Sequence, residues 1–357
     1  MAIAPPCSNL SKGTLMNLIT GGSGFVGSCI ARKLIERGER VRVLDIVGPE
    51  LSAQKGKFEF CKIDIRNRQQ VIDACEGMRR IFHIVSLVPI SKAGKGFRDV
   101  NVQGTRNIME GALKHGVSKV LHMSSSAVYD LNQQNPLNEN SRIDPLGGYG
   151  RSKYGGEQVC IEYRKKGLDV SIVRPRTVIG AERLGIFSIL FDWIRAGKNI
   201  YIIGSGKNRI QFVEVEELAE ACILMTEKAS NDVFNIGTDR FGTLREDLEV
   251  LIRHAGSSSR VVGLNPALSI SLLKVLDKLN LSPLADWHYL TYHKDFYFDI
   301  SKAKSVLGWQ PKYSNVEMLV EAYNWYLNNR EKVKNQVGTT HKLSIRQGVL
   351  KLIRHIS

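Results

Sequence analysis

A tyrosine and a lysine four residues apart, Tyr149 and Lys153, have the side chains needed to move a proton at an alcohol. Residues 149–166 predict a helix, and helical positions four apart project from the same face. A free tyrosine has a pKa of about 10 and is a poor base at neutral pH. A lysine ammonium beside the ring favours the phenolate, so Tyr149 is the expected acid–base group and Lys153 its electrostatic partner.

Three consecutive serines, Ser124 to Ser126, follow the apolar run 119–123. A serine hydroxyl at the end of that predicted strand can hold the alcohol oxygen that Tyr149 would deprotonate. Each motif alone also occurs by chance, since strand ends often have serine and helix tyrosines usually serve packing. Their order in the chain, after a nucleotide-binding motif, favours catalysis.

That motif is a glycine-rich turn between the apolar residues 17–20 and a helical pattern at 25–38. Gly21 permits a tight turn, Gly24 lets the backbone approach a pyrophosphate, and Gly27 lets the helix pack on the strand. The pyrophosphate would lie at the helix N-terminus, where free N–H groups favour negative charge. We expect the cofactor to contact Gly21, Gly24, Phe25, Val26 and Gly27.

Asp45 follows Gly27 by 18 residues and ends the second predicted strand. A carboxylate there can accept hydrogen bonds from the adenosine ribose and repels a 2′-phosphate, which favours NAD over NADP. Asp64 and Ile65, after the third strand, are expected to border the adenine. With NAD bound, Tyr149 would take a hydroxyl proton while hydride leaves the same carbon.

The elements that position these residues alternate between strands and helices. Strands are predicted at 17–20, 41–45, 58–63, 80–87, 119–123 and 170–174, and helices at 25–38, 69–76, 101–115 and 149–166. Strand–helix alternation predicts an α/β fold of the Rossmann type, with a doubly wound parallel sheet. The strands lack a period of two, as expected when helices cover both faces of a sheet.

The domain boundaries follow from where this alternation stops. Residues 15–178 are predicted to form the NAD-binding Rossmann domain, to which the chain returns at about 210–238. Residues 179–209 and 239–330 form a smaller, discontinuous substrate-binding region. Residues 331–357 form a basic amphipathic tail, for which a membrane surface and the protein's own surface are alternative contacts.

The amino-acid composition restricts the classes of molecule that the protein is expected to bind. The 50 Lys and Arg against 35 Asp and Glu leave a formal charge of 50 − 35 = +15, which suggests an anionic partner. No nucleic-acid-binding signature accompanies the charge, so a phosphorylated small molecule is preferred. The six cysteines show neither a disulfide framework nor a zinc pattern, and no metal is expected. The absence of a signal peptide and of a long apolar segment suggests a cytoplasmic protein.

Together these motifs resemble the extended short-chain dehydrogenase/reductase superfamily, in its NAD-dependent epimerase/dehydratase family. The resemblance covers most of residues 15–330. It includes the glycine loop, Asp45, residues 101–105, Ser125, Tyr149 with Lys153, residues 174–175, 212–215 and 298–309. It implies that Ser125, Tyr149 and Lys153 are the catalytic triad and that Asn101 helps order the cofactor site. It also implies a homodimer, built through helices 101–115 and 149–166.

Departures from the family pattern restrict the reaction. Sugar-nucleotide dehydratases of this group have acidic residues directly after the catalytic Ser or Thr, where this chain has Ser126 and Ala127. Many UDP-sugar epimerases have an arginine where Ile210 stands. We expect Arg209 or Arg176 to replace it, and Ser126, Arg176 and Arg209 to contact the substrate.

The leading hypothesis is therefore an NAD-dependent sugar 4-epimerase that acts through a keto intermediate on a nucleotide- or polyprenyl-diphosphate-linked sugar. Residues 204–208 also resemble the 3β-hydroxysteroid dehydrogenase branch, so a sterol-type NAD-dependent dehydrogenase is the alternative. Polyprenyl-diphosphate-linked sugars and sterols are both substrates at or near membranes. Either substrate is compatible with peripheral membrane contact through the basic tail. A non-catalytic nucleotide-binding protein is a minority alternative, since Tyr149 and Lys153 are both present.

Overall fold

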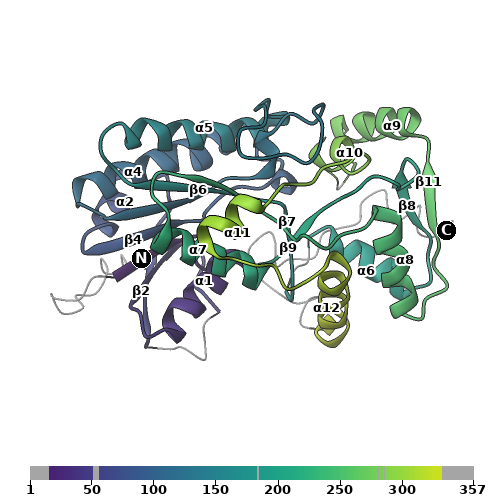
Figure 1. The fold of residues 1–357 in the computed structure, drawn as a ribbon, viewed down its shortest axis with the longest axis horizontal. Helices are drawn as coiled ribbons and strands as arrows, with labels where there is room; N and C mark the ends of the chain where they lie inside the picture. The colour runs from purple at the N-terminus through teal and green to yellow at the C-terminus, as the bar shows by residue number, and fades with distance from the viewer. Residues whose placement is uncertain are drawn as a thin grey trace.

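Seven parallel strands form the central sheet, in the order β10-β6-β5-β4-β1-β2-β3 (Figure 1). The structure, a computed structural model, describes residues 16–50, 56–182, 185–279, 281–282, 284 and 286–331. The sheet consists of β1 (Met16–Thr20), β2 (Val41–Asp45), β3 (Phe58–Lys62), β4 (Met78–His83), β5 (Lys119–Met123), β6 (Val170–Pro175) and β10 (Val233–Ile236). All of its strand pairs are parallel, which confirms the predicted doubly wound sheet.

Helices cover both faces of this sheet. One face packs against α1 (Phe25–Glu36), α7 (Val215–Lys228) and α11 (Ser301–Leu307), and the other against α2 (Arg68–Ala74), α4 (Gly104–Lys114) and α5 (Gly147–Arg164) (Figure 1). Apolar positions at helical spacing, such as Ile30 and Leu34 of α1, are fully buried on the sheet. Because strands are apolar on both faces, they are covered on both sides.

Several boundaries differ from the sequence-based expectation, and two of these differences are linked. The strand predicted to reach residue 87 ends at His83, and the helix predicted from residue 101 begins as a π-helix over Asp99–Gln103. One side chain links both changes, since the amide oxygen of Asn101 accepts a hydrogen bond from the backbone N–H of Leu87 at 2.8 Å. The segment after His83 therefore bonds to the π-helix in place of a neighbouring strand.

A second apolar core lies beyond the sheet. It is built from β7 (Thr177–Ile179), β8 (Ile200–Ile203), β9 (Phe212–Glu214), β11 (Val261–Leu264), α6 (Phe187–Arg195), α8 (Leu244–His254) and α12 (Asn315–Asn328). Strands β7 and β9 pair in parallel, as do β8 and β11. Three further helices are α3 (Gly96–Arg98), α9 (Pro266–Lys278) and α10 (Asp286–Thr291), of which α9 and α10 lie beside this core (Figure 1). Helix α11 belongs to the first core instead, through Ala303 and Leu307.

Helix α9 differs from the other long helices because none of its residues is buried. Its apolar residues Leu268, Leu272 and Val275 lie on one face, and Leu268 is 74% exposed. Within the part of the chain that the structure describes, no helix has the length and apolarity to cross a membrane. The predicted basic tail, from residue 332 on, and the residues before 16 lie outside the described residues.

Four of the cysteines, Cys29, Cys75, Cys160 and Cys222, are buried free thiols, as expected of small core residues. Burial raises the pKa of the Cys75 thiol to about 12, which leaves it protonated and unreactive. Cys61 is the exception, because it is disulfide-bonded. The cysteines therefore do not all behave as reduced core residues.

A buried ion pair joins α5 to β6. The guanidinium of Arg174 donates from Nε to Glu157 Oε1 at 2.8 Å and from Nη2 to Glu157 Oε2 at 2.6 Å. The same carboxylate accepts from the hydroxyl of Ser124, and Arg174 Nη1 donates to the hydroxyl of Tyr129 at 2.8 Å. Because both charges are almost fully buried, each depends on the other for compensation.

Substitution of one partner leaves the other charge buried and unpaired. We expect Glu157→Gln to lower the free energy of unfolding by about 3–5 kcal/mol, measured by urea denaturation. The matched control is Glu162→Gln on the same helix, whose exposed carboxylate pairs with Arg106 and Lys166. A surface ion pair contributes little to the free energy of unfolding. Equal losses of unfolding free energy in the two variants would therefore show that the buried pair does not stabilise the fold more than a surface pair does.

Candidate active site

The beginning of α5 brings Tyr149 to the carboxyl edge of the sheet. Gly150, the next residue, packs so closely that a β-carbon there would lie 2.6 Å from the backbone oxygen of Ala127. The turn that follows β5 and the first turn of α5 are therefore in direct contact. The ring of Tyr149 is half-buried and lies edge-on to Phe97, with 6.1 Å between ring centres.

Lys153 lies one turn further along the helix, with only 2% of its surface exposed. Its ammonium donates to the backbone oxygen of Met123 at 2.5 Å and to the hydroxyl of Ser86 at 3.4 Å. Burial lowers the pKa of Lys153 to about 8, although the Glu157 carboxylate acts in the opposite direction. A charge held at this depth, one helical turn from Tyr149, is placed to stabilise a phenolate.

Ser125 follows Met123 by two residues and caps the short 3₁₀ turn Ser126–Val128. Its backbone is extended, and its hydroxyl oxygen accepts a hydrogen bond from the N–H of Ala127 at 3.1 Å. The hydroxyl proton therefore stays free to be donated to another oxygen. This residue lies at the end of β5, the strand whose last carbonyl holds Lys153.

Asn101 connects three of the segments around this site. Its amide oxygen accepts from Leu87 and Ser86, while its amide nitrogen donates to Leu87 and to the hydroxyl of Ser152 at 2.9 Å. All of the amide's polar atoms are thus used within the protein. The geometry supports a positioning role, because Asn101 fixes the residue next to Lys153 and the segment that contains Ser86.

The glycine loop has the shape of a dinucleotide cradle. Gly21 has φ +69°, and a β-carbon at Gly27 would lie 2.2 Å from the backbone oxygen of Gly21. Side chains at these positions would fill the space between the loop and the helix that follows. Helix α1 then begins at Phe25 with Gly24 at its N-cap and no side chain capping its free N–H groups. These N–H groups fit a pyrophosphate.

Asp45 lies beside this loop at the end of β2. Its carboxylate accepts from the backbone N–H of Ser23 at 3.1 Å and of Ile46 at 2.8 Å. Burial raises the pKa of the Asp45 carboxyl above its ordinary value, against the effect of these N–H donors. The carboxylate thus borders the cradle, as a ribose-binding group requires.

The two residues expected at the adenine differ in their surroundings. The Asp64 carboxylate binds the Arg66 side chain, with 2.5 Å between Oδ2 and Nη2, and this ion pair holds its pKa below the ordinary value. Ile65 is buried, and its carbonyl accepts from Asn107 of α4 at 2.9 Å. Asp64 is therefore committed to its neighbour, while Ile65 supplies an apolar surface.

The three residues expected at the substrate are split between two places. Arg176 lies directly after β6, is buried, and donates from Nη1 to the hydroxyl of Ser126 at 3.0 Å. Arg209 lies on the surface against the rings of Phe241 and Tyr297, with its guanidinium carbon 4.8 and 4.7 Å from the two ring centres, which are 5.3 Å from each other. Arg176 and Ser126 thus form one cluster, and Arg209 forms a separate cationic position.

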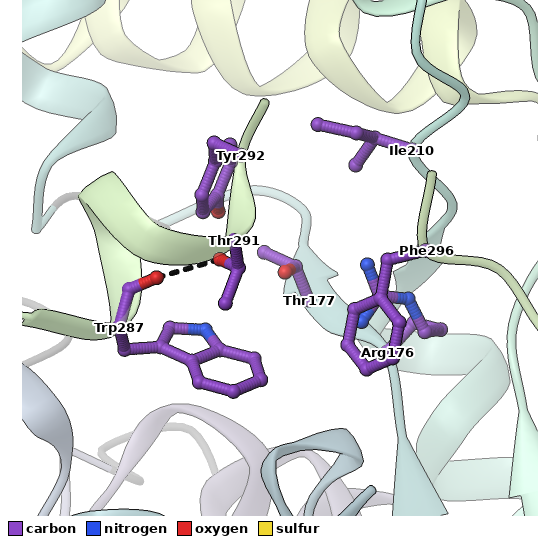
Figure 2. Close-up of a pocket in the computed structure, with 7 residues that line it drawn as sticks. All are labelled: Arg176, Thr177, Ile210, Trp287, Thr291, Tyr292 and Phe296. Carbon is purple, nitrogen blue, oxygen red and sulfur yellow. Dashed lines mark hydrogen bonds between the residues drawn. The ribbon is translucent and has the colours of Figure 1, made fainter. Parts of the chain in front are cut away.

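A cavity of about 10 Å³ opens beside Arg176. Figure 2 shows the guanidinium beside the ring of Phe296, with the other lining side chains around the space. The lining consists of Arg176, Thr177, Ile210, Trp287, Thr291, Tyr292 and Phe296. Sequence analysis missed Thr177 and the four lining residues between positions 287 and 296. The only signal for these four is a dense aromatic run, which more often indicates packing.

The first comparison with known proteins concerns the sequence family. Residues 17–237 match the NAD dependent epimerase/dehydratase family. An uncharacterized protein, y4nG, of Sinorhizobium fredii is 40% identical, over 94% of this chain and 85% of its own. A putative UDP-glucose 4-epimerase of Methanocaldococcus jannaschii is 31% identical over 88% of this chain and 99% of its own. Sterol demethylase protein B of Methylococcus capsulatus is 28% identical over 73% and 81%.

The fold is also similar to solved structures. UDP-glucose 4-epimerase of Thermotoga maritima, crystallised with UDP-glucose, matches with a TM-score of 0.75 and 25% identity. The match covers 88% of this chain and all of the epimerase. The similarity therefore extends through the second core, beyond the residues that the family match covers.

The close contact at Gly27 leads to a binding test. We expect Gly27→Ala to lower the affinity for NAD roughly tenfold or more, because its β-carbon would displace the loop that cradles the pyrophosphate. Titration of NAD by calorimetry measures this loss.

The matched control is Gly48→Ala in the loop after β2, where an added β-carbon would meet only Phe60, at 3.9 Å. NAD affinity should be unchanged in this variant. Wild-type affinity in Gly27→Ala would contradict the assignment of the loop.

Proposed function

This chain belongs to the NAD-dependent epimerase/dehydratase family, and we propose that it is a 4-epimerase of a diphosphate-linked sugar. The family and its neighbours are enzymes of the extended short-chain dehydrogenase/reductase type, with NAD as cofactor. One observation supports the site more than any other. The Lys153 ammonium is buried and bonded at the end of the strand that leads to Ser125, one helical turn from Tyr149.

Each residue of this group has a distinct proposed role. Tyr149 takes the proton of the secondary alcohol and later returns a proton to the same oxygen. Lys153 lowers the free energy of the phenolate by its charge, and Ser125 donates a hydrogen bond that holds the substrate oxygen. The glycine loop and Asp45 would hold NAD, which would supply the hydride acceptor and donor at the carbinol carbon.

The residues after Ser125 support epimerisation over dehydration. Elimination of water needs an acid placed beside the neighbouring carbon, and the structure has Ser126 and Ala127 there. The Ser126 oxygen accepts from Arg176, and Ala127 is completely buried. Neither side chain can supply a carboxylic acid.

Arg209 supports the proposal that the substrate sugar is linked to a diphosphate. Its guanidinium packs against a pair of adjoining aromatic rings, Phe241 and Tyr297, and makes no ion pair with the residues that the structure describes. An exposed planar cation of this kind suits a diphosphate. Ile210, at the place where many epimerases have their arginine, instead lines the cavity next to Arg176.

A sterol-type dehydrogenase is the second candidate, and the cavity wall favours it. Ile210, Trp287 and Phe296 give the cavity apolar and aromatic walls that suit a ring hydrocarbon. Helix α9, whose Leu268 and Leu272 are exposed, contacts the cavity-lining helix α10. An apolar surface so near the site is compatible with a substrate that comes from a membrane.

The assembly and location are part of the same proposal. We expect a homodimer through α4 and α5, whose exposed apolar residues include Leu113 and Ile161. The cytoplasm is the expected location, and the tail from residue 332 is the expected contact with a membrane surface.

The fate of the cofactor separates the two candidates. An epimerase regenerates NAD in place, so we expect freshly purified, extensively dialysed protein to release nearly one equivalent of NAD on denaturation. Chromatography of the released nucleotide measures this amount. An empty protein that binds NAD reversibly would favour net dehydrogenation of a sterol or another secondary alcohol. Bound NADP would contradict the assignment of Asp45.

The acid–base role of Tyr149 has its own test. We expect Tyr149→Phe to abolish turnover, because the phenolate is lost, while NAD binding stays within about twofold of wild type. Epimerisation is measured by the exchange of C4 configuration in UDP-glucose. Tyr163→Phe, at the far end of the same helix, is the control and should retain activity. Turnover in Tyr149→Phe at the wild-type rate would refute the role.

A further inference from the structure

Arg176 is a buried cation without a buried anion. Its side chain is 5% exposed, and it makes no ion pair with any residue in the described ranges. Nη1 donates to the Ser126 hydroxyl, but Nε is buried and has no hydrogen-bond acceptor. Arg174, only two residues earlier, is equally buried and has both oxygens of the Glu157 carboxylate.

This arrangement is unfavourable in the absence of a ligand. Burial lowers the pKa of the Arg176 guanidinium to about 9, and no carboxylate among the described residues opposes the shift. The ring of Phe296, whose centre lies 4.0 Å from the guanidinium carbon, compensates part of the charge. A ring face does not accept the N–H bonds that a guanidinium offers in its plane, so Nε still has no partner.

The unpaired group faces the cavity described above. The cavity has room for about one water molecule. Its other polar side-chain groups are hydroxyls and the indole N–H of Trp287, and Thr291 already donates to the backbone oxygen of Trp287 at 2.6 Å. Arg176 is therefore the only ionic group in the lining, and the ring of Phe296 lies beside it (Figure 2). A small anion would find a charge there in largely apolar surroundings, where water screens it weakly.

The position of Arg176 indicates which part of a substrate would carry this anion. Strands β5 and β6 are parallel neighbours, and Met123 lies opposite Val173. Their ends place Arg176 beside Ser126, and Ser126 is adjacent to Ser125, the proposed binding group for the alcohol oxygen. An anion bound by Arg176 would therefore lie next to the reacting oxygen. On the substrate, this is the place of a substituent on the neighbouring carbon.

We propose that Arg176 binds a substrate carboxylate, and that the substrate is a β-hydroxy acid whose carboxylate is attached to the carbon next to the oxidised alcohol. Among sugars this is a uronic acid oxidised at C4. A carboxylate matches the planar guanidinium, whereas a phosphate is bulkier and not planar. This inference rests on the proposed function for the identity of the reacting oxygen, but the anion site itself does not.

The anion site is tested with probes that need no knowledge of the rest of the substrate. In ¹⁵N-arginine-labelled, NAD-loaded protein, the Arg176 Nε–H resonance is the one that disappears in Arg176→Lys. Acetate should shift this resonance saturably, whereas acetamide, which has the same shape without the charge, should not. A larger response to inorganic phosphate than to acetate, or no response to acetate, would overturn the carboxylate site.

The substrate class is tested with a pair of ligands that differ only in the carboxylate. UDP-glucuronate should bind NAD-loaded protein at least about tenfold more tightly than UDP-glucose, as a charge-assisted hydrogen bond predicts. Arg176→Met should reduce this preference to within about twofold. Arg195→Met removes a surface charge paired with Asp192 and should leave the preference unchanged. Equal affinity for the two ligands in wild-type protein would overturn the inference for a sugar substrate.

The two proposals fail in distinguishable ways. If acetate binds at Arg176 but neither sugar is oxidised or epimerised, the proposed function fails and the anion site stands. If both sugars are epimerised equally well and Arg176→Met changes neither rate, the function stands and the β-hydroxy acid is excluded. A melting curve of Arg176→Met shows whether the variant is folded, and the wild-type comparisons do not depend on that variant.

Discussion

The ion pair between Glu157 and Arg174 holds the candidate site together. Glu157 is on the helix that bears Tyr149 and Lys153, and Arg174 is on the strand that leads to Arg176. In a dry interior two such charges attract strongly, and neither can leave without exposing the other to an apolar surrounding. The bidentate geometry also fixes an orientation, so helix α5 cannot rotate relative to the sheet. The position of Tyr149 over the strand ends depends on this constraint.

The same carboxylate extends the constraint to other segments. It accepts from Ser124, the first serine after β5, and Arg174 continues through Tyr129 to Asn235 of strand β10. Three neighbouring strands are thereby tied to one helix by a buried polar network with all partners present. Networks of this kind are specific in geometry because each member would be costly to leave unpaired.

Lys153 and Arg176 are buried cations of a different kind. Arg174 is paired with a carboxylate. The Lys153 ammonium donates to one backbone carbonyl and to a more distant hydroxyl. The Arg176 guanidinium donates to one hydroxyl and lies over one aromatic ring. Burial lowers the pKa of both groups, which is the physical sign of a charge without enough compensation. Both lie at the carboxyl edge of the sheet, where α/β proteins bind their ligands. An incompletely compensated cation has its field available for a phenolate or a bound anion.

The fold could be predicted from sequence because its signals are local. Strands such as Val41–Asp45 are short apolar runs between polar turns, and Gly21, Gly24 and Gly27 appear as a spacing in the chain. The errors lie where a distant side chain replaces a local partner, as when Asn101 ends the strand at His83. The domain boundaries and the catalytic roles remain predictions, although the geometry brings Lys153 to the strand that precedes Ser125.

The sequence by itself determined the parallel sheet, the NAD cradle and the position of Tyr149 and Lys153 one turn apart on a helix, because periodicity, glycine spacing and helical pitch relate residues that are near one another in the chain. Only the tertiary structure decided which arginine has a counter-ion. Arg174 and Arg176 look alike in sequence, and positions two apart on a regular strand would share one face of the sheet, but β6 ends at Pro175 and Arg176 lies beyond it. Arg174 pairs with Glu157 of α5, whereas Arg176 lies over the ring of Phe296 and lines a cavity. Electrostatic compensation is decided by packing between distant segments, and no local pattern contains it.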